Sequence, residues 1–162
     1  MRDPYTVSTR AVSIRARPEQ IWPWLAQMGA GRGGLYSYDW LDRLFGYTSA
    51  ASSDKILPQF QGLAVGDVIP LGSGPSWPVI VADRNQALVV EPVTGAVSWA
   101  WTLSVLDAST TRLISRVRVR LGHKPLLLAC APAVDLPWFL MERKMLRGIK
   151  RRAEGLAQAA DC

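Results

Sequence analysis

Two neighbouring segments alternate between apolar and polar residues, and this alternation constrains the fold more than any other feature of the chain. Within residues 97–106 every second side chain is large and apolar, and within residues 111–121 arginines stand opposite the apolar positions. The apolar faces would comprise Val97, Trp99, Trp101, Leu103 and Val105 in the first segment, and Leu113, Ser115, Val117, Val119 and Leu121 in the second. A strand with one apolar and one solvated face is typical of an antiparallel sheet.

Shorter patterns predict the elements that precede these strands. Further strands are predicted over residues 6–16, 67–71, 77–82 and 87–93, with turn residues at the breaks. A helix is predicted from Gln20 to Met28, with Pro23 in its first turn, where a missing N–H costs no hydrogen bond. A second helix is predicted over residues 37–46, with Ser37 as its N-cap.

A long amphipathic helix is predicted to end the chain, from about Asp135 to Ala159, after a turn or short helix. Its inward stripe would be Trp138, Met141, Met145, Ile149 and Leu156. The apolar run over residues 125–141 is about 17 residues long and contains Pro132, Asp135 and Pro137, whereas a membrane-spanning helix needs roughly 20 apolar residues. We therefore do not interpret this run as a membrane span.

The composition fits one compact α+β domain. The chain has 162 residues, of which 49% are hydrophobic and 20% charged, so we expect a single domain over residues 1–162 with its core between about residues 6 and 155. No secretory signal is visible in the first 25 residues, and Cys130 and Cys162 form no disulfide pattern. These features favour a cytoplasmic protein.

The net charge of +6 comes mostly from the predicted terminal helix. Its basic residues are Arg143, Lys144, Arg147, Lys150, Arg151 and Arg152. Such a run is usually the solvated face of an amphipathic helix, but Arg143, Lys144, Arg147, Lys150 and Arg151 could also make weak contact with an anionic membrane surface. No nucleic-acid-binding motif accompanies the run, so we expect no nucleic-acid partner. The sequence does not indicate the oligomeric state.

Three glycines match the dinucleotide-binding fingerprint, but their context excludes that function. Gly29, Gly31 and Gly34 satisfy G-x-G-x-x-G. In a dinucleotide site a strand enters the glycine turn and a helix leaves it, within a βαβ unit. Here a predicted helix enters and no βαβ alternation follows, so we interpret the glycines as a helix stop and a flexible gate.

The sequence offers little for metal or cofactor chemistry. His123 is the only histidine, which excludes a multi-histidine metal site, and we interpret it as an exposed or capping residue before a turn. Cys130 lies in an apolar run and is interpreted as a small core residue. We therefore expect no metal ion and no cofactor.

Three carboxylates stand out: Asp39, Asp42 and Glu142. Asp39 lies among Tyr36, Tyr38 and Trp40, where apolar surroundings would raise a carboxyl pKa toward that of an acid or base catalyst. The alternative is that Asp39 only complements the dipole in the first turn of a helix. Glu142 has candidate ion-pair partners in Arg143, Lys144 or an arginine of a strand.

Aromatic residues are the most informative side chains. Seven Trp and four Tyr outnumber three Phe, and they cluster on the first two helices, one strand face and the start of the long helix. Trp and Tyr combine a large apolar face with one polar group, which suits a cavity for a flat or hydrophobic ligand. A well-filled aromatic core is the alternative.

Several short stretches resemble one superfamily. They are Ile21-Trp22-Pro23-Trp24-Leu25, residues 31–41 (Gly-Arg-Gly-Gly-Leu-Tyr-Ser-Tyr-Asp-Trp-Leu), residues 65–70 (Val-Gly-Asp-Val-Ile-Pro), Trp99-Ala100-Trp101 and residues 141–146 (Met-Glu-Arg-Lys-Met-Leu). With the order of elements, they resemble a bacterial branch of the START-like (SRPBCC) helix-grip superfamily, which includes polyketide cyclase/dehydrase and lipid-transport proteins. The resemblance covers roughly residues 6–155. It implies a curved antiparallel sheet wrapped around a long C-terminal helix, with two short helices after the first strand.

In that fold, the resemblance implies a cavity between the sheet and the long helix, closed by the short helices and loops. Placed in this frame, the sheet would contribute Trp99, Trp101, Leu103, Ser115 and Val117, the long helix Trp138, Met141 and Met145, and the gate Trp24, Met28, Tyr36, Tyr38 and Trp40. The superfamily shares a scaffold rather than one set of catalytic residues, so no catalytic role is carried over.

Two functions remain. The first is binding of a hydrophobic small molecule, such as a lipid, a polyketide or an aromatic metabolite, in this cavity. The second is a cofactor-independent cyclase, aromatase or dehydratase that holds a polyketide-like substrate and transfers a proton. In that case Asp39 would be the catalytic group, with Tyr36 and Tyr38 as hydrogen-bond donors.

Overall fold

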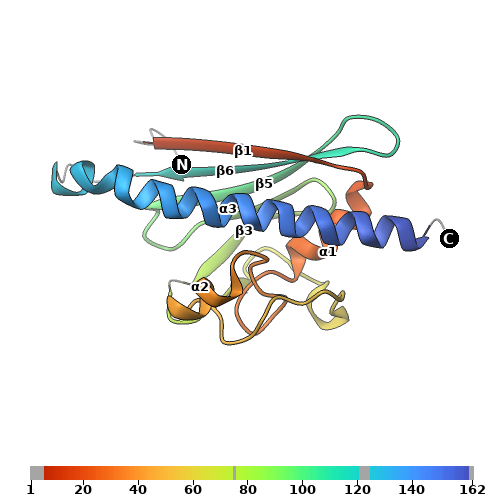
Figure 1. Ribbon diagram of the computed structural model, residues 1–162, viewed down its shortest axis with the longest axis horizontal. Helices are drawn as coiled ribbons and strands as arrows, with labels where there is room; N and C mark the ends of the chain where they lie inside the picture. The colour runs from red at the N-terminus through yellow and green to blue at the C-terminus, as the bar shows by residue number, and fades with distance from the viewer. Residues whose placement is uncertain (1–5, 75, 121–124, 161–162) are drawn as a thin grey trace.

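The fold is a single antiparallel sheet with a long helix lying along one face. The computed structural model describes residues 6–74, 76–120 and 125–160 (Figure 1). Six strands pair in the order β1-β6-β5-β4-β3-β2. They are β1 (Thr6–Ile14), β2 (Val68–Ile69), β3 (Trp77–Asp83), β4 (Ala87–Val90), β5 (Val97–Val105) and β6 (Thr111–Val119), and all the pairings are antiparallel. This confirms the predicted α+β class and the meander.

The described residues also form three helices and one short 3-10 turn. Helix α3 (Pro125–Ala160) runs along the sheet, while α1 (Pro18–Ala26), α2 (Asp39–Leu44) and the 3-10 turn η1 (Pro58–Phe60) belong to the segment between β1 and β2. Figure 1 shows this segment gathered beside α3, so that it flanks the helix on the side away from β1. No helix among the described residues is both long enough and apolar enough to cross a membrane.

The register between β5 and β6 explains the alternating sequence pattern. Trp99 pairs with Val117, Trp101 with Ser115 and Leu103 with Leu113. Side chains at paired positions share one face of a sheet, so these six residues form the surface under α3. On the opposite face, Arg112 and Arg116 are exposed. The predicted faces are confirmed at these paired positions and at Arg112 and Arg116. Val105 is an exception, because it is 63% exposed, and so is Ser98, which is buried although it lies on the other face. Leu121 lies outside the described residues.

Helix α1 begins earlier than the sequence predicted. Its first residue is Pro18, because Gln20 Oε1 accepts a hydrogen bond from the backbone N–H of the N-cap residue Arg17, at 2.9 Å. Pro23 therefore lies beyond the first turn, and the helix lacks one internal hydrogen bond there. Burial offsets this loss, since the helix buries Ile21, Trp22, Trp24, Leu25 and Ala26.

Two other predicted boundaries were wrong. Helix α2 starts at Asp39 with Tyr38 as its N-cap, and Ser37 does not cap it. Ser37 Oγ instead accepts a hydrogen bond from the Tyr38 N–H at 2.5 Å and donates one to Asp42 at 3.4 Å. Helix α3 starts at Pro125 rather than near Asp135, because proline at the first helical position loses no hydrogen bond. From the sequence alone, the interior prolines favour a break. His123 and the side chain of Cys130 lie outside the described residues.

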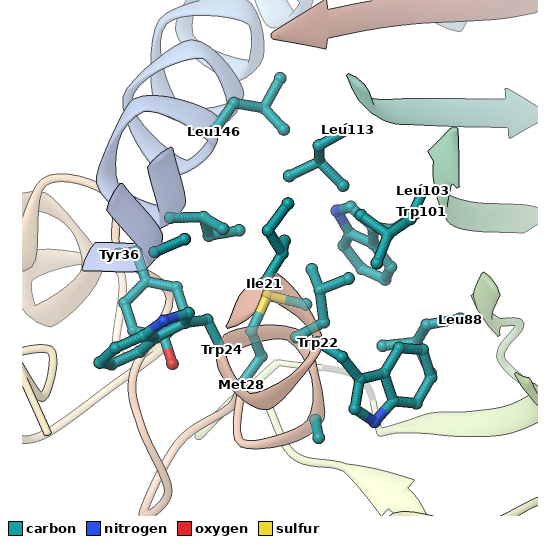
Figure 2. Close-up of a cluster of buried hydrophobic side chains, with 14 of the residues drawn as sticks. Ile21, Trp22, Trp24, Met28, Tyr36, Leu88, Trp101, Leu103, Leu113 and Leu146 are labelled. Carbon is teal, nitrogen blue, oxygen red and sulfur yellow. The ribbon is translucent and has the colours of Figure 1, made fainter. Parts of the chain in front are cut away.

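The core lies where α1, α3 and the sheet meet. Figure 2 shows Ile21 of α1, Leu113 of β6 and Leu146 of α3 converging on one another. Tyr36 packs against the same cluster with only 1% of its surface exposed. Its ring meets that of Trp24 edge-on, with centroids 6.1 Å apart, and the Arg152 guanidinium lies 4.8 Å from its centroid. Tyr36 is thus part of the core that joins the loops to α3.

The contact between Tyr36 and α3 depends on a glycine, which gives a testable prediction. A Cβ atom added to Gly148 would lie 2.3 Å from the Tyr36 carbonyl oxygen. We expect Gly148→Ala to lower the free energy of unfolding by about 1–2 kcal/mol, because the backbone at Tyr36 must move. Gly155→Ala on the same helix is the control, since nothing lies within 4 Å of its added Cβ. That variant should gain up to about 1 kcal/mol from helix propensity. Equal effects in urea unfolding would contradict the proposed close contact.

Candidate functional site

A cavity of about 130 Å³ lies between α3, the sheet and the segment that carries α2. Most of its wall is aromatic or aliphatic, and the few polar residues are Ser37, Asp42, Tyr47 and Glu142. The lining residues are Leu35, Ser37, Asp42, Tyr47, Leu71, Trp77, Trp99, Trp138, Met141, Glu142 and Met145. Several of them, including Leu35, Trp138 and Met141, are only half-buried, so the cavity opens toward solvent on the side of α3. An apolar cavity with a few convergent polar groups is the usual form of a small-molecule site.

Three tryptophans form the aromatic wall. The ring centroid of Trp99 lies 6.1 Å from that of Trp77 and 5.1 Å from that of Trp138, with interplanar angles of 70° and 52°. All three rings contribute to the lining of the cavity. Trp99 is held in place by its indole N–H, which donates to Ser115 Oγ at 2.8 Å.

Behind this wall, Glu142 anchors a buried polar network. Its side chain is 1% exposed, forms an ion pair with Arg10 of β1 through Oε2, and accepts a hydrogen bond from Ser115 Oγ through Oε1 at 2.6 Å. Of the partners that the sequence left open for Glu142, the strand arginine is the one observed. Both carboxylate oxygens therefore have partners, and the network connects Arg10, Glu142, Ser115 and Trp99 in one chain.

Asp42 is the second buried carboxylate at the cavity, and its situation is different. The residue is 0% exposed. Within the part of the chain that the structure describes, its Oδ1 accepts only the long hydrogen bond from Ser37, and its Oδ2 has no hydrogen-bond partner. Burial raises the pKa of Asp42 from the ordinary 3.8 to about 6, opposed by the Ser37 hydrogen bond and assisted by the nearby charge of Asp39. At neutral pH the group is therefore a buried charge without a counter-ion among the described residues.

Four of the predicted ligand-binding residues line the cavity together: Trp99, Trp138, Met141 and Met145. Met28 and Trp101 line a smaller neighbouring cavity of about 20 Å³, which shares Leu35, Leu71, Trp77, Trp99 and Met145 with the first. Leu103 and Val117 are buried in the sheet face, and Ser115 supports Trp99 without lining the cavity.

The structure does not bring Trp24 and Trp40 to the cavity. Trp24 is buried against Tyr36 and lines a separate groove beside the C-terminal part of α3, with Arg151 and Arg152. Trp40 is 62% exposed, because α2 turns it outward while Asp42 faces inward. A six-residue helix has too few positions for its sequence to indicate which side is buried.

The three candidate catalytic residues do not line the cavity. Asp39 accepts hydrogen bonds from the Ser52 backbone N–H at 3.1 Å and from Ser52 Oγ at 2.7 Å, so its carboxylate ties the start of α2 to the loop that follows it. The Tyr36 hydroxyl is buried, and burial raises its pKa well above the ordinary range of tyrosine. Tyr38 is half-buried, with Lys144 Nζ 5.5 Å from its ring centroid. A catalytic role for these residues stays a prediction.

Seven of the lining residues were not among the predicted site residues: Leu35, Ser37, Asp42, Tyr47, Leu71, Trp77 and Glu142. Trp77 begins a strand whose inward face is apolar, so the period-two pattern carried a signal for it. Glu142 precedes Met145 by one helical turn and therefore shares its face. Leu35, Tyr47 and Leu71 lie in irregular segments, where no periodicity indicates direction.

The basic residues of α3 divide into two groups. Arg143, Lys144, Arg147 and Arg151 are exposed, whereas Lys150 and Arg152 are less so and bind the rest of the protein. Lys150 Nζ donates to the Ser13 carbonyl at 2.8 Å, and Arg152 pairs with Asp54 at 2.8 Å. Lys150 and Arg152 therefore hold α3 against the rest of the protein, whereas weak contact of the exposed residues with an anionic membrane surface stays a prediction.

Comparison with known proteins shows the fold. No family model and no curated protein matches this sequence. The solution structure of KanY is similar, with a TM-score of 0.56 and 14% identity over 92% of this chain and 97% of that one. The Aha1 dimer from Colwellia psychrerythraea is similar with a TM-score of 0.52 and 15% identity, over 90% of this chain and 96% of that one. TTHA0849 from Thermus thermophilus is similar with a TM-score of 0.50 and 14% identity, over 97% of this chain and 100% of that one.

These similarities and the sheet-and-helix architecture define the class. The chain has a helix-grip fold, with an antiparallel sheet and a long C-terminal helix across it, as the resemblance implied. At identities this low the likeness concerns the fold, and the function has to be argued from the site.

Proposed function

We propose that this protein binds a hydrophobic small molecule, with a ring-sized apolar part, in the cavity between α3, the sheet and α2. The observation that carries this proposal is the cavity itself, whose wall combines three tryptophans with leucine and methionine side chains. Rigid aromatic walls lose little side-chain entropy when a ligand is bound, and they bury a large apolar area.

The size of the cavity limits the ligand. An apolar cavity of roughly 150 Å³ in another protein holds one benzene molecule. The present cavity, at about 130 Å³, accommodates one ring or a short branched chain. A larger molecule would place this part inside and extend past the half-buried Trp138 and Met141 toward solvent.

The first experiment is native mass spectrometry of the protein as purified, followed by solvent extraction and identification of whatever is released. A bound apolar molecule at one-to-one stoichiometry supports the proposal and indicates a ligand class. An empty protein is then titrated with ring-sized probes such as indole by isothermal titration calorimetry. Absence of both a co-purified molecule and saturable probe binding would contradict the proposal.

A cavity-filling variant tests the location. Met141→Trp adds bulk at the cavity mouth, so we expect ligand or probe affinity to fall at least about tenfold, because displacing a well-packed apolar group from a site of this size costs on the order of 1.4 kcal/mol or more. Leu140→Trp is the matched control, since Leu140 precedes Met141 on α3, is 44% exposed and does not line the cavity. Equal binding by the two variants would show that the ligand binds elsewhere.

A further inference from the structure

The unpartnered charge of Asp42 indicates the chemistry of the ligand's polar part. We propose that the cavity recognises an organic cation, a protonated amine or quaternary ammonium group attached to an apolar body, with Asp42 as its counter-ion. This inference rests on the proposed function and deepens it, because it names the class of ligand that the same cavity takes.

The first step is the absence of a protein counter-ion. Among the described residues, no Lys or Arg side chain forms an ion pair with Asp42. On α2 the nearby charge is Asp39, which repels, and from the preceding loop Ser37 donates one long hydrogen bond. A buried carboxylate is costly unless a charge or strong donors compensate it. A ligand cation would supply that compensation.

The second step is that the other buried acid and the neighbouring cations leave the charge of Asp42 uncompensated. Glu142 of α3 lines the same cavity, but Arg10 neutralises it and Ser115 occupies its second oxygen. Lys144 of α3 lies over the Tyr38 ring, and Arg43 of α2 donates to the Asp39 carbonyl. The net charge that these groups leave facing the cavity is therefore the single negative charge of Asp42.

The third step is the aromatic wall. Trp77, Trp99 and Trp138 line the cavity with inclined rings, and Tyr47 adds a fourth aromatic residue. The negative faces of aromatic rings attract cations, most strongly where water is excluded, and tryptophan is the strongest of them. Aromatic rings together with one carboxylate suit an ammonium group better than a neutral or anionic one.

Matched pairs of probes test the charge directly. At pH 7.5, calorimetric titration compares choline with its neutral isostere 3,3-dimethylbutan-1-ol, and 2-phenylethylamine with 2-phenylethanol. We expect each cation to bind at least about tenfold more tightly than its neutral partner, as expected for a desolvated cation–π contact together with an ion pair. The two cations also distinguish a purely electrostatic attraction from a hydrogen bond, because only the amine has N–H groups that can donate to Asp42 Oδ2.

Substitution of Asp42 assigns the effect to this residue. Asp42→Asn should reduce the affinity for both cations about tenfold or more and leave the neutral probes within about threefold. Asp39→Asn is the control, because it removes the same charge from the same helix at a residue that does not line the cavity. It should change cation affinity by less than about threefold. Retention of cation affinity in Asp42→Asn would overturn the inference.

A pH series on the unmodified protein gives an independent readout that needs no variant. The charge of choline does not depend on pH, so any change reports the protein. Because the pKa of Asp42 is raised to about 6, choline affinity should be constant above about pH 7 and fall about tenfold per pH unit below about 6. A flat profile between pH 5 and pH 8 contradicts the inference.

The outcomes also separate the inference from the proposed function. If the neutral probes bind as tightly as the cations and Met141→Trp abolishes both, the cavity is an apolar site and the cation inference is wrong. If no probe binds and nothing co-purifies, the proposed function itself fails.

Discussion

Asp42→Asn is expected to make the protein more stable at pH 7.5, by about 1–3 kcal/mol, although it alters a buried residue that touches a cavity. The shift of the Asp42 pKa from 3.8 to about 6 corresponds to about 3 kcal/mol of native-state destabilisation at neutral pH, at 1.36 kcal/mol per unit. Asparagine has nearly the same shape and no charge. The lower end of the range allows for an imperfectly hydrogen-bonded buried amide.

The sign follows from proton linkage. Because the folded protein holds the Asp42 proton more tightly than the unfolded chain does, protonation stabilises the native state as pH falls from about 6 toward 3.8, and ionisation destabilises it as pH rises through about 6. The advantage of Asp42→Asn over the unmodified protein should therefore be full above about pH 7. It should shrink steadily toward pH 4.

Urea unfolding of both proteins at pH 7.5, 6 and 4.5 checks this. A variant that is less stable than the unmodified protein at pH 7.5 would show that the Asp42 carboxylate has a favourable partner. A stabilising substitution in a cavity is informative about function as well, because residues kept at a cost to stability concentrate at binding sites. Ligand cation, added to saturation, should stabilise the unmodified protein more than Asp42→Asn.

Most of the sheet could be predicted because its signal is local. Alternation in Val97–Val105 and Thr111–Val119 determines which side chains share a face, and the register of the two strands then places Trp99 opposite Val117 under α3. The helix boundaries were less predictable. Pro23 lies inside α1 and Pro125 starts α3, and only tertiary packing decides whether a proline ends a helix.

The cavity was predictable only where regular elements line it. Trp99, Trp138, Met141 and Met145 lie on a strand and a helix whose periodicity indicates direction. Asp42 and Trp40 lie two residues apart on α2, one buried and the other exposed, and six residues carry too little periodicity to orient such a helix. The aromatic neighbours of Asp39 in the sequence favour a catalytic role, yet its carboxylate binds Ser52.

For Glu142 we expect a substitution to have the opposite effect on stability from one at Asp42, because the charge of Glu142 is compensated. Arg10 pairs with it across α3 and β1, Ser115 donates to its other oxygen, and Ser115 in turn accepts the Trp99 indole N–H. Removing one partner of a buried ion pair leaves the other charge without compensation, whereas a solvent-exposed pair contributes little. The side chain of Arg10 is 21% exposed, so part of its charge would be solvated after such a change.

We therefore expect Glu142→Gln to lower the free energy of unfolding by about 2–4 kcal/mol. Glu154→Gln is the matched control on the same helix, since Glu154 pairs with the exposed Arg15 at 3.8 Å and with Lys150 at 3.6 Å, and it should cost less than about 1 kcal/mol. Arg10→Met combined with Glu142→Gln should recover at least half of the loss, because no charge is then left unpaired. Equal costs for the two glutamate variants would mean that the ion pair does not hold the tryptophan wall against α3, and the cavity would need another support.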